Sequence, residues 1–190
     1  MSDFNKIVNN IERGVEQLHA HHFQQGARWY PAAQEVCQQL ATDYNKNLRQ
    51  VVGICSALSP MKEWELNKRM TEQFLIEQKC GTFPNQIDKS LKLLDLVIND
   101  LTPDKSDKYI MTILNGRKTQ SFYHNIMYPD TSQYVTVDRH MMKLFPDHWS
   151  WVISDRKYRI TEEAFQYVAS NLKMIPCALQ ATLWVKFREK

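Results

Sequence analysis

The residues best suited to chemistry form two short groups in the second half of the sequence. The first group places a tight Asn-Gly turn before two basic residues, at Asn115-Gly116-Arg117-Lys118-Thr119. A helix that begins after such a turn directs backbone N–H groups and positive charge to one point. Phosphate groups bind at helix starts of this kind. The spacing therefore predicts a helical hairpin that holds a phosphate, or an ordinary helix corner with exposed cations.

The second group is centred on Asp138, which follows the short apolar run Tyr134-Val135-Thr136-Val137. Cleavage of a C–N glycosidic bond builds positive charge on the sugar, and a fixed carboxylate stabilises that charge. A lysine amine that loses its proton offers a second route, because it can attack the sugar carbon and form a Schiff base. Asp138 thus has two interpretations, catalytic carboxylate or helix cap, and Lys118 also has two, nucleophile or phosphate contact.

The runs Gly116-Arg117-Lys118-Thr119 and Val137-Asp138-Arg139-His140 together resemble the motif of the helix-hairpin-helix base-excision DNA glycosylases, typified by endonuclease III. The resemblance implies that Asp138 is the catalytic carboxylate and that Lys118 is the nucleophile, as in the bifunctional members. It also implies an all-α fold of two helical lobes with the active site between them. One lobe would comprise residues 48–144, and the other would comprise residues 1–47 and 145–190.

Further site residues follow from the same resemblance. The segment 54–58, with Leu66-Asn67-Lys68 after it, is similar to the family's helix and DNA-intercalating loop. Leu58 or Ser59 would then fill the gap that a flipped base leaves in the duplex. The expected DNA contacts at the hairpin are Asn115, Gly116, Arg117 and Thr119. Apart from the resemblance, the residue types make His140 a candidate hydrogen-bonding group of the substrate pocket or a structural one. Trp64 and Tyr30, with Trp29 and Tyr123, are candidates to stack on an extruded base or to belong to the core.

The expected partner is double-stranded DNA with an extruded base, and a protein partner remains an open alternative. No cofactor is expected, because the four cysteines lie far apart and the C-terminal region holds only Cys177 where many relatives carry four iron–sulfur ligands. Zinc is not expected at His19, His21 and His22, because no cysteine or carboxylate lies near them at ligand spacing.

Composition limits the remaining classes of protein. The 190 residues are 43% hydrophobic, which is enough for a real core, and the net charge is only +3. Binding to nucleic acid must therefore depend on local clusters of cations. No apolar run approaches the roughly 20 residues that span a bilayer, and the N-terminus lacks the features of a secretory signal. We therefore expect no membrane association and a cytoplasmic location.

Apolar spacing predicts a helix in nearly every part of the chain. Proline marks the expected starts at Trp29-Tyr30-Pro31, Ser59-Pro60 and Pro176, and Thr161 is an expected cap. Residues 134–137 are expected to be extended. The predicted helices are 4–18, 29–45, a nearly buried 48–58, 60–75, 87–101, 104–114, 117–127, 138–144, one starting at 161, and one starting at 176.

Three hypotheses for function remain open at this stage. The first is a DNA glycosylase-like enzyme that releases a damaged or modified base. The second is a transferase or lyase that acts on hypermodified pyrimidines in phage DNA. It is suggested by a looser resemblance of the sequence to phage-encoded proteins grouped with the same fold, and its product would be a changed base. The third is a non-catalytic module that binds DNA or protein, for which Asp138→Asn would preserve function.

Overall fold

The computed structural model describes residues 1–98, 101–150 and 152–189, and the chain divides into two compact units. Unit 1 comprises Met1–Ala32 and Tyr128–Lys190, and unit 2 comprises Ala33–Met127. All regular secondary structure of the described residues is helical, which confirms the all-α prediction. The expected lobe 48–144 is shared between the two units, with 48–127 in unit 2 and 128–144 in unit 1.

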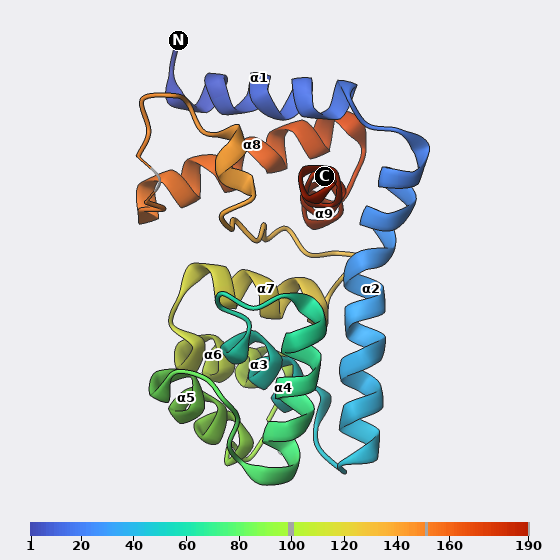
Figure 1. Ribbon diagram of the computed structural model, residues 1–190, viewed down its shortest axis with the longest axis vertical. Helices are drawn as coiled ribbons and strands as arrows, with labels where there is room; N and C mark the ends of the chain where they lie inside the picture. The colour runs from blue at the N-terminus through green and yellow to red at the C-terminus, as the bar shows by residue number, and fades with distance from the viewer. Residues whose placement is uncertain (99–100, 151, 190) are drawn as a thin grey trace. The chain divides into compact units, whose positions relative to one another are not determined.

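Unit 1 is built on helices from both ends of the chain. Helix α1 (Asp3–Glu16) packs along α8 (Asp155–Leu172), and α8 packs against α9 (Pro176–Arg188) (Figure 1). The short 3-10 helix η1 (Met141–Leu144) contacts α1. The fully buried side chains of this core include Ile7, Ile11, Val135, Met141, Phe165, Leu179 and Leu183. The sequence segments that surround Asp138 are therefore held by residues far away in the chain.

Unit 2 is organised around α3 (Leu48–Leu58), whose residues from Val51 onward are all buried. Helices α4 (Trp64–Glu77), α5 (Pro84–Leu94), α6 (Pro103–Leu114) and α7 (Arg117–Met127) all contact α3 (Figure 1). The prediction of a nearly buried helix over 48–58 is confirmed. A capping box begins this helix, because the Asn47 side chain accepts the Arg49 N–H and Gln50 Oε1 accepts the Asn47 N–H.

Helix α2 (Ala20–Asp43) begins well before the predicted start at Trp29. Pro31 was expected in the first turn of a helix, but it lies in the interior of this one. The helix starts where the His22 side chain accepts the His19 N–H at 2.8 Å, which is half of a capping box made with histidine. Gly26 then lies against α9, because an added Cβ would be 2.6 Å from the backbone nitrogen of Thr182.

Two predicted helix boundaries in unit 2 are wrong. Ser59 ends α3 and donates to Ser56 O at 2.9 Å, and α4 starts only at Trp64 after Glu63. Helix α5 ends at Leu94, far short of 101, and residues 99–100 lie outside the described residues. The cause of this early end is Gln50, whose amide donates to the carbonyl groups of Leu93, Leu94 and Leu96.

Two helix predictions in unit 1, the start at Thr161 and the helix after Asp138, also need correction. Helix α8 begins at Asp155 with Ser154 as its cap, and Thr161 lies inside it with its hydroxyl donating to Lys157 O at 2.8 Å. Residues 133–138 are in neither a helix nor a strand, and Val135 and Val137 are buried as the apolar run indicated. The predicted helix after Asp138 is the single 3-10 turn η1. No helix in the described parts of the chain is both long and apolar enough to traverse a bilayer.

Candidate functional site

The predicted hairpin forms in unit 2 with the expected bounds. Helix α6 ends at Leu114, Asn115 adopts a left-handed conformation with φ 47°, and α7 begins at Arg117. Asparagine tolerates this conformation better than most residues, so the Asn-Gly pair stops one helix and permits the next. Arg117 and Lys118 occupy the first turn of α7, where backbone N–H groups have no partner within the helix.

Residues outside the turn hold the hairpin closed. The Lys89 ammonium on α5 donates to Leu114 O at 2.8 Å and to Asn115 Oδ1 at 2.9 Å. Thr119 is buried and donates to Gly116 O at 2.9 Å. Burial lowers the pKa of Lys89 from its usual value. Lys89 is therefore a further cation of this region, and its position 25 residues before Leu114 gave no local signal in the sequence.

The loop after α3 differs from its predicted role. Leu58 is fully buried and Ser59 is 8% exposed, so the surface of the loop is formed by other residues. Met61 is 82% exposed and has a left-handed φ of 63°, which is unusual for a bulky side chain. Trp64 is half-buried at the start of α4, and the Lys68 ammonium lies 5.8 Å from the centroid of its ring.

Asp138 lies in unit 1, and both of its carboxylate oxygens accept hydrogen bonds. Oδ1 accepts the backbone N–H of His140 at 2.8 Å and that of Met141 at 3.3 Å. Oδ2 accepts the indole N–H of Trp184 at 3.2 Å. Asp138 therefore caps η1 with one oxygen and is fixed by α9 with the other. The side chain stays half-buried, which leaves it accessible from solvent.

Tyr158 fixes the chain that leads to Asp138. Its buried hydroxyl donates to Val135 O at 2.7 Å and accepts the N–H of Val137 at 3.2 Å. The Val135 N–H donates to the Glu162 carboxylate at 3.1 Å. Helix α8 thus supplies the partners that a neighbouring strand would otherwise supply, and this explains why an apolar run with extended spacing forms no sheet.

Aromatic rings and cations surround the Asp138 carboxylate. The Arg188 guanidinium lies 4.4 Å from the Trp184 ring centroid, and the rings of Trp29 and His140 meet that ring edge-on at 5.5 and 6.1 Å. Burial lowers the pKa of His140, the Asp138 charge raises it, and the nearby charges of Arg139, Arg188 and Lys143 lower it further. Asp138 is therefore an anion within a positively charged aromatic cluster. Sequence reasoning missed Trp184 and Arg188, since both come from a helix about 50 residues later.

Tyr30, expected to stack on a base, is part of the unit 1 core. Its exposed fraction is 3%, and its hydroxyl lies 2.8 Å from Gln180 Oε1 and 3.0 Å from Thr136 Oγ. The structure thus brings Asp138, His140 and Tyr30 into unit 1. It brings Lys118, Asn115, Gly116, Arg117, Thr119, Leu58, Ser59 and Trp64 into unit 2.

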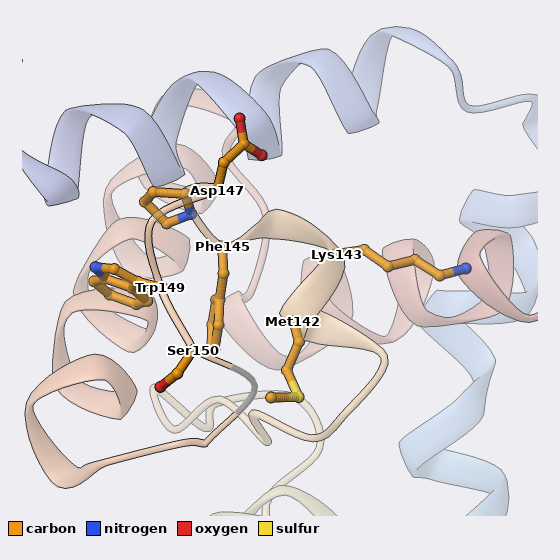
Figure 2. A pocket seen from close by; sticks show the side chains of 7 residues that line it. Met142, Lys143, Phe145, Asp147, Trp149 and Ser150 are labelled. Carbon is orange, nitrogen blue, oxygen red and sulfur yellow. The ribbon is translucent and has the colours of Figure 1, made fainter.

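The aromatic segment after η1 lines a small pocket of unit 1 (Figure 2). The pocket is lined by Met142, Lys143, Phe145, Pro146, Asp147, Trp149 and Ser150. Phe145 packs edge-on against Trp149 at 4.9 Å, and Lys157 donates to Ser150 and Val152. The Lys143 side chain extends away from the pocket in Figure 2 and donates to Phe187 O at 2.7 Å. Polar groups therefore do not converge here, and Trp151 lies outside the described residues.

A histidine cluster near the start of α2 has ligand atoms spaced as in a metal site, but the position of the His22 proton disfavours metal binding. Nitrogen atoms of His21 and His22 and an oxygen of Glu189 all lie within 4.8 Å of one another. The Nδ1 atom of His22 accepts the His19 N–H, so a neutral ring carries its proton on Nε2, 2.8 Å from Glu189. A protonated nitrogen donates a hydrogen bond and is no metal ligand. Hydrogen bonds from His22 and His21 accordingly lower the pKa of Glu189 to about 2.

The protein is therefore an all-helical protein of two units, with a helical hairpin in one unit and a fixed aspartate in the other. The chain belongs to the Family of unknown function (DUF7178), whose sequence profile matches residues 2–190. No curated protein and no solved structure matches the chain.

Proposed function

We propose that the protein is a DNA glycosylase-like enzyme that cleaves the N-glycosidic bond of a modified or damaged nucleotide. The single observation that carries the proposal is the Asp138 carboxylate, which is held through both oxygens yet only half-buried, within a cluster of aromatic rings and cations. A carboxylate that serves only as a cap needs one oxygen. The second hydrogen bond, from Trp184, fixes the position of the negative charge.

Asp138 would act by stabilising charge that develops during the reaction. As the bond between the sugar carbon and the base nitrogen breaks, its electron pair leaves with the base and the sugar becomes oxocarbenium-like. Water then adds its oxygen to the sugar carbon; one of its protons is transferred to the departing base, and the other stays on that oxygen as the new sugar hydroxyl. A carboxylate that is already fixed stabilises the cation without reorganising, and charges held in place in this way account for much of the rate acceleration of many enzymes.

The hairpin of unit 2 would bind the DNA backbone. Arg117 and Lys118 supply charge, and the first turn of α7 supplies backbone N–H groups and the positive end of the helix dipole. Trp29 and Trp184, both half-buried beside Asp138, are the aromatic rings available for stacking in unit 1. Lys118 is either the phosphate contact or the nucleophile of a bifunctional enzyme.

The test is a base-release assay on duplex oligonucleotides that carry uracil, 5-hydroxymethyluracil, alkylated purines or oxidised purines. Abasic sites are detected by alkaline cleavage of the strand. Asp138→Asn keeps the cap to η1 but removes the charge, and the rate should fall about 100- to 1,000-fold. The matched control is Asp147→Asn, an exposed acid of the same unit, which should release base at the wild-type rate.

The other outcomes assign other functions. A changed base without an abasic site would contradict the glycosylase proposal and favour modification of a pyrimidine. Absence of any turnover, together with unchanged DNA binding by Asp138→Asn, would favour a binding module. Borohydride trapping then separates the roles of Lys118, because a covalent adduct that is lost in Lys118→Ala identifies the nucleophile.

A further inference from the structure

The start of α2 and the C-terminal end of α9 meet through a group of three histidines, His19, His21 and His22, with Glu189 of α9 beside them. The three rings lie against one another, with 3.9 Å between the centroids of His21 and His22 and 5.6 Å between those of His19 and His22. All four residues belong to unit 1. The proposed glycosidic chemistry makes no use of them.

His22 is the fully buried member of this group. Its exposed fraction is 0%, and its two ring nitrogens face different helices. Nδ1 accepts the backbone N–H of His19 at 2.8 Å, which caps the first turn of α2. Nε2 lies 2.8 Å from a carboxylate oxygen of Glu189, the residue at which α9 ends. One neutral ring thus joins the start of one helix to the end of another.

A second proton on His22 is incompatible with this arrangement. The proton can go only to Nδ1, because Nε2 already carries one, and Nδ1 then becomes a donor. Two N–H groups would face each other where the cap had been, so the ring or the backbone of His19 must move away. Histidine side chains gain this proton between about pH 8 and about pH 5.

The neighbouring charges act in the same direction. At acid pH His19 and His21 would be positive as well, and the Lys186 ammonium already lies 3.4 Å from the other oxygen of Glu189. Glu189 stays ionised, because hydrogen bonds from His22 and His21 lower its pKa to about 2. Its single negative charge cannot balance three charged rings and a lysine, so the group repels itself.

We infer that the three histidines and Glu189 form an acid-sensitive lock, which fastens the start of α2 to the end of α9 at neutral pH and releases both when His22 takes up its second proton. The opening is local, because the core of unit 1 is held by apolar contacts of residues such as Ile7, Phe165 and Leu183, which no proton changes. The lock itself does not depend on the proposed glycosidic chemistry.

The last turn of α9 also contacts the region of Asp138. Phe187 O accepts a hydrogen bond from the Lys143 ammonium of η1 at 2.7 Å, and the Trp184 indole binds Asp138 about one turn earlier in the helix. Release of Glu189 should therefore loosen the Lys143 contact. Under the proposed function, on which this one consequence rests, acid pH would weaken the support of the carboxylate.

The experiment measures hydrogen-exchange protection factors of single amides by NMR in the full chain, at about pH 7.5 and about pH 5. Protection over residues 19–26 and 185–189 should fall about 2- to 30-fold at the lower pH, which corresponds to loss of one helix cap. The amides of α8 should keep their protection. His22→Gln should remove most of the fall, because glutamine at this position of a capping box accepts the same N–H but takes up no proton.

The matched control is His148→Gln, which removes an exposed histidine of the same unit that lies 3.0 Å from Asp3 and should keep the wild-type fall. Glu189→Gln removes the carboxylate from an exposed position and should deepen the fall, since nothing then offsets the charged rings. This second variant keeps the test decisive if His22→Gln does not fold.

Three results would overturn the inference. The first is equal protection of wild type at both pH values, or a fall spread uniformly over unit 1. The second is an equal fall in His22→Gln and His148→Gln, and the third is a shallower fall in Glu189→Gln than in wild type. None of these measurements uses base release, so failure of the lock and failure of the proposed function are distinguishable.

Discussion

The hairpin of unit 2 and the turn that Asp138 closes in unit 1, residues 138–141 (the acidic turn), are both short and polar, yet they are built in opposite ways. The bounds of the hairpin are set by its own neighbours in sequence, since Asn115 stops α6 and Thr119 bonds back to Gly116, and Lys89 of α5 adds support from another helix. The acidic turn depends on distant partners, because Trp184 holds Asp138 and Tyr158 holds the chain before it. A local motif survives changes elsewhere in its unit, whereas a turn assembled from distant helices fails when those helices move.

The largest difference in unfolding free energy between the two regions is expected from alanine substitutions at Gly26 in unit 1 and Gly116 in the hairpin. An alanine at position 26 would overlap the backbone of Thr182 on α9, the helix that carries Trp184, and should cost about 3 kcal/mol of unfolding free energy. Gly116→Ala would place its Cβ 3.3 Å from the Thr119 hydroxyl and 3.8 Å from Leu114 O, and should change stability by less than about 1 kcal/mol.

Urea unfolding gives the two free energies, and hydrogen exchange assigns each loss to a unit. Gly26→Ala should expose amides of α9 and of the Asp138 turn while α6 and α7 stay protected. Uniform loss of hydrogen-exchange protection over both units, or a larger loss of unfolding free energy in Gly116→Ala than in Gly26→Ala, would contradict this difference between the two regions.

An intermediate effect is expected at the tyrosine that supports the acidic turn. Tyr158→Phe removes a buried hydroxyl and leaves Val135 O and the Val137 N–H without that partner, at a cost of about 1–3 kcal/mol. Tyr167→Phe on the same helix removes an exposed hydroxyl and is the matched control. Urea denaturation of Tyr158→Phe and Tyr167→Phe measures the difference in unfolding free energy. Equal values would show that the segment before Asp138 needs no support from α8.

The smallest effect is expected from pH, at half-buried His124 on α7. Burial lowers the pKa of His124, and the charge of Asp107 partly opposes the shift. The unfolded chain then takes up a proton more readily than the folded one, so stability should fall as the pH drops from about 7 to about 5. His124→Gln should flatten this dependence, while His148→Gln at an exposed ion pair should not. A pH profile unchanged by His124→Gln would contradict the assignment.

The helices that sequence patterns predicted best are those whose ends are set locally. Helices α3 and α7 have the predicted bounds, and α9 begins at Pro176 as expected. Asn47, Asn115 and a first-turn proline act within a few residues, so their effect is visible in a short window.

Some of the wrong boundaries involve contacts between distant residues, and others involve residues whose local bonds were misassigned. Pro31 looked like a helix start, but packing of Gly26 against α9 continues α2 through it. The end of α5 depends on Gln50 of another helix. Thr161 resembled a cap because a threonine hydroxyl can accept a backbone N–H at a helix start, whereas inside α8 it donates to the Lys157 carbonyl.

The candidate site follows the same division. The hairpin and the position of Asp138 at a helix start were predictable, since both are local patterns. Trp184, Arg188 and Lys89 were not, because only the folded units bring them to those positions. Leu58 and Ser59 were chosen for their place in the chain, and their burial shows that Met61 forms the surface of that loop.

Gln50 shows how strongly one ordinary polar residue can be restricted in this chain. Its amide oxygen begins one helix while its amide nitrogen ends another, with 2.8 Å to Leu94 O as the shortest contact. Glutamate has the same length but would set negative charge against three carbonyl oxygens, and asparagine is too short to span the distance. The position therefore admits almost no exchange, although a glutamine near a helix start is usually among the most replaceable residues of a protein.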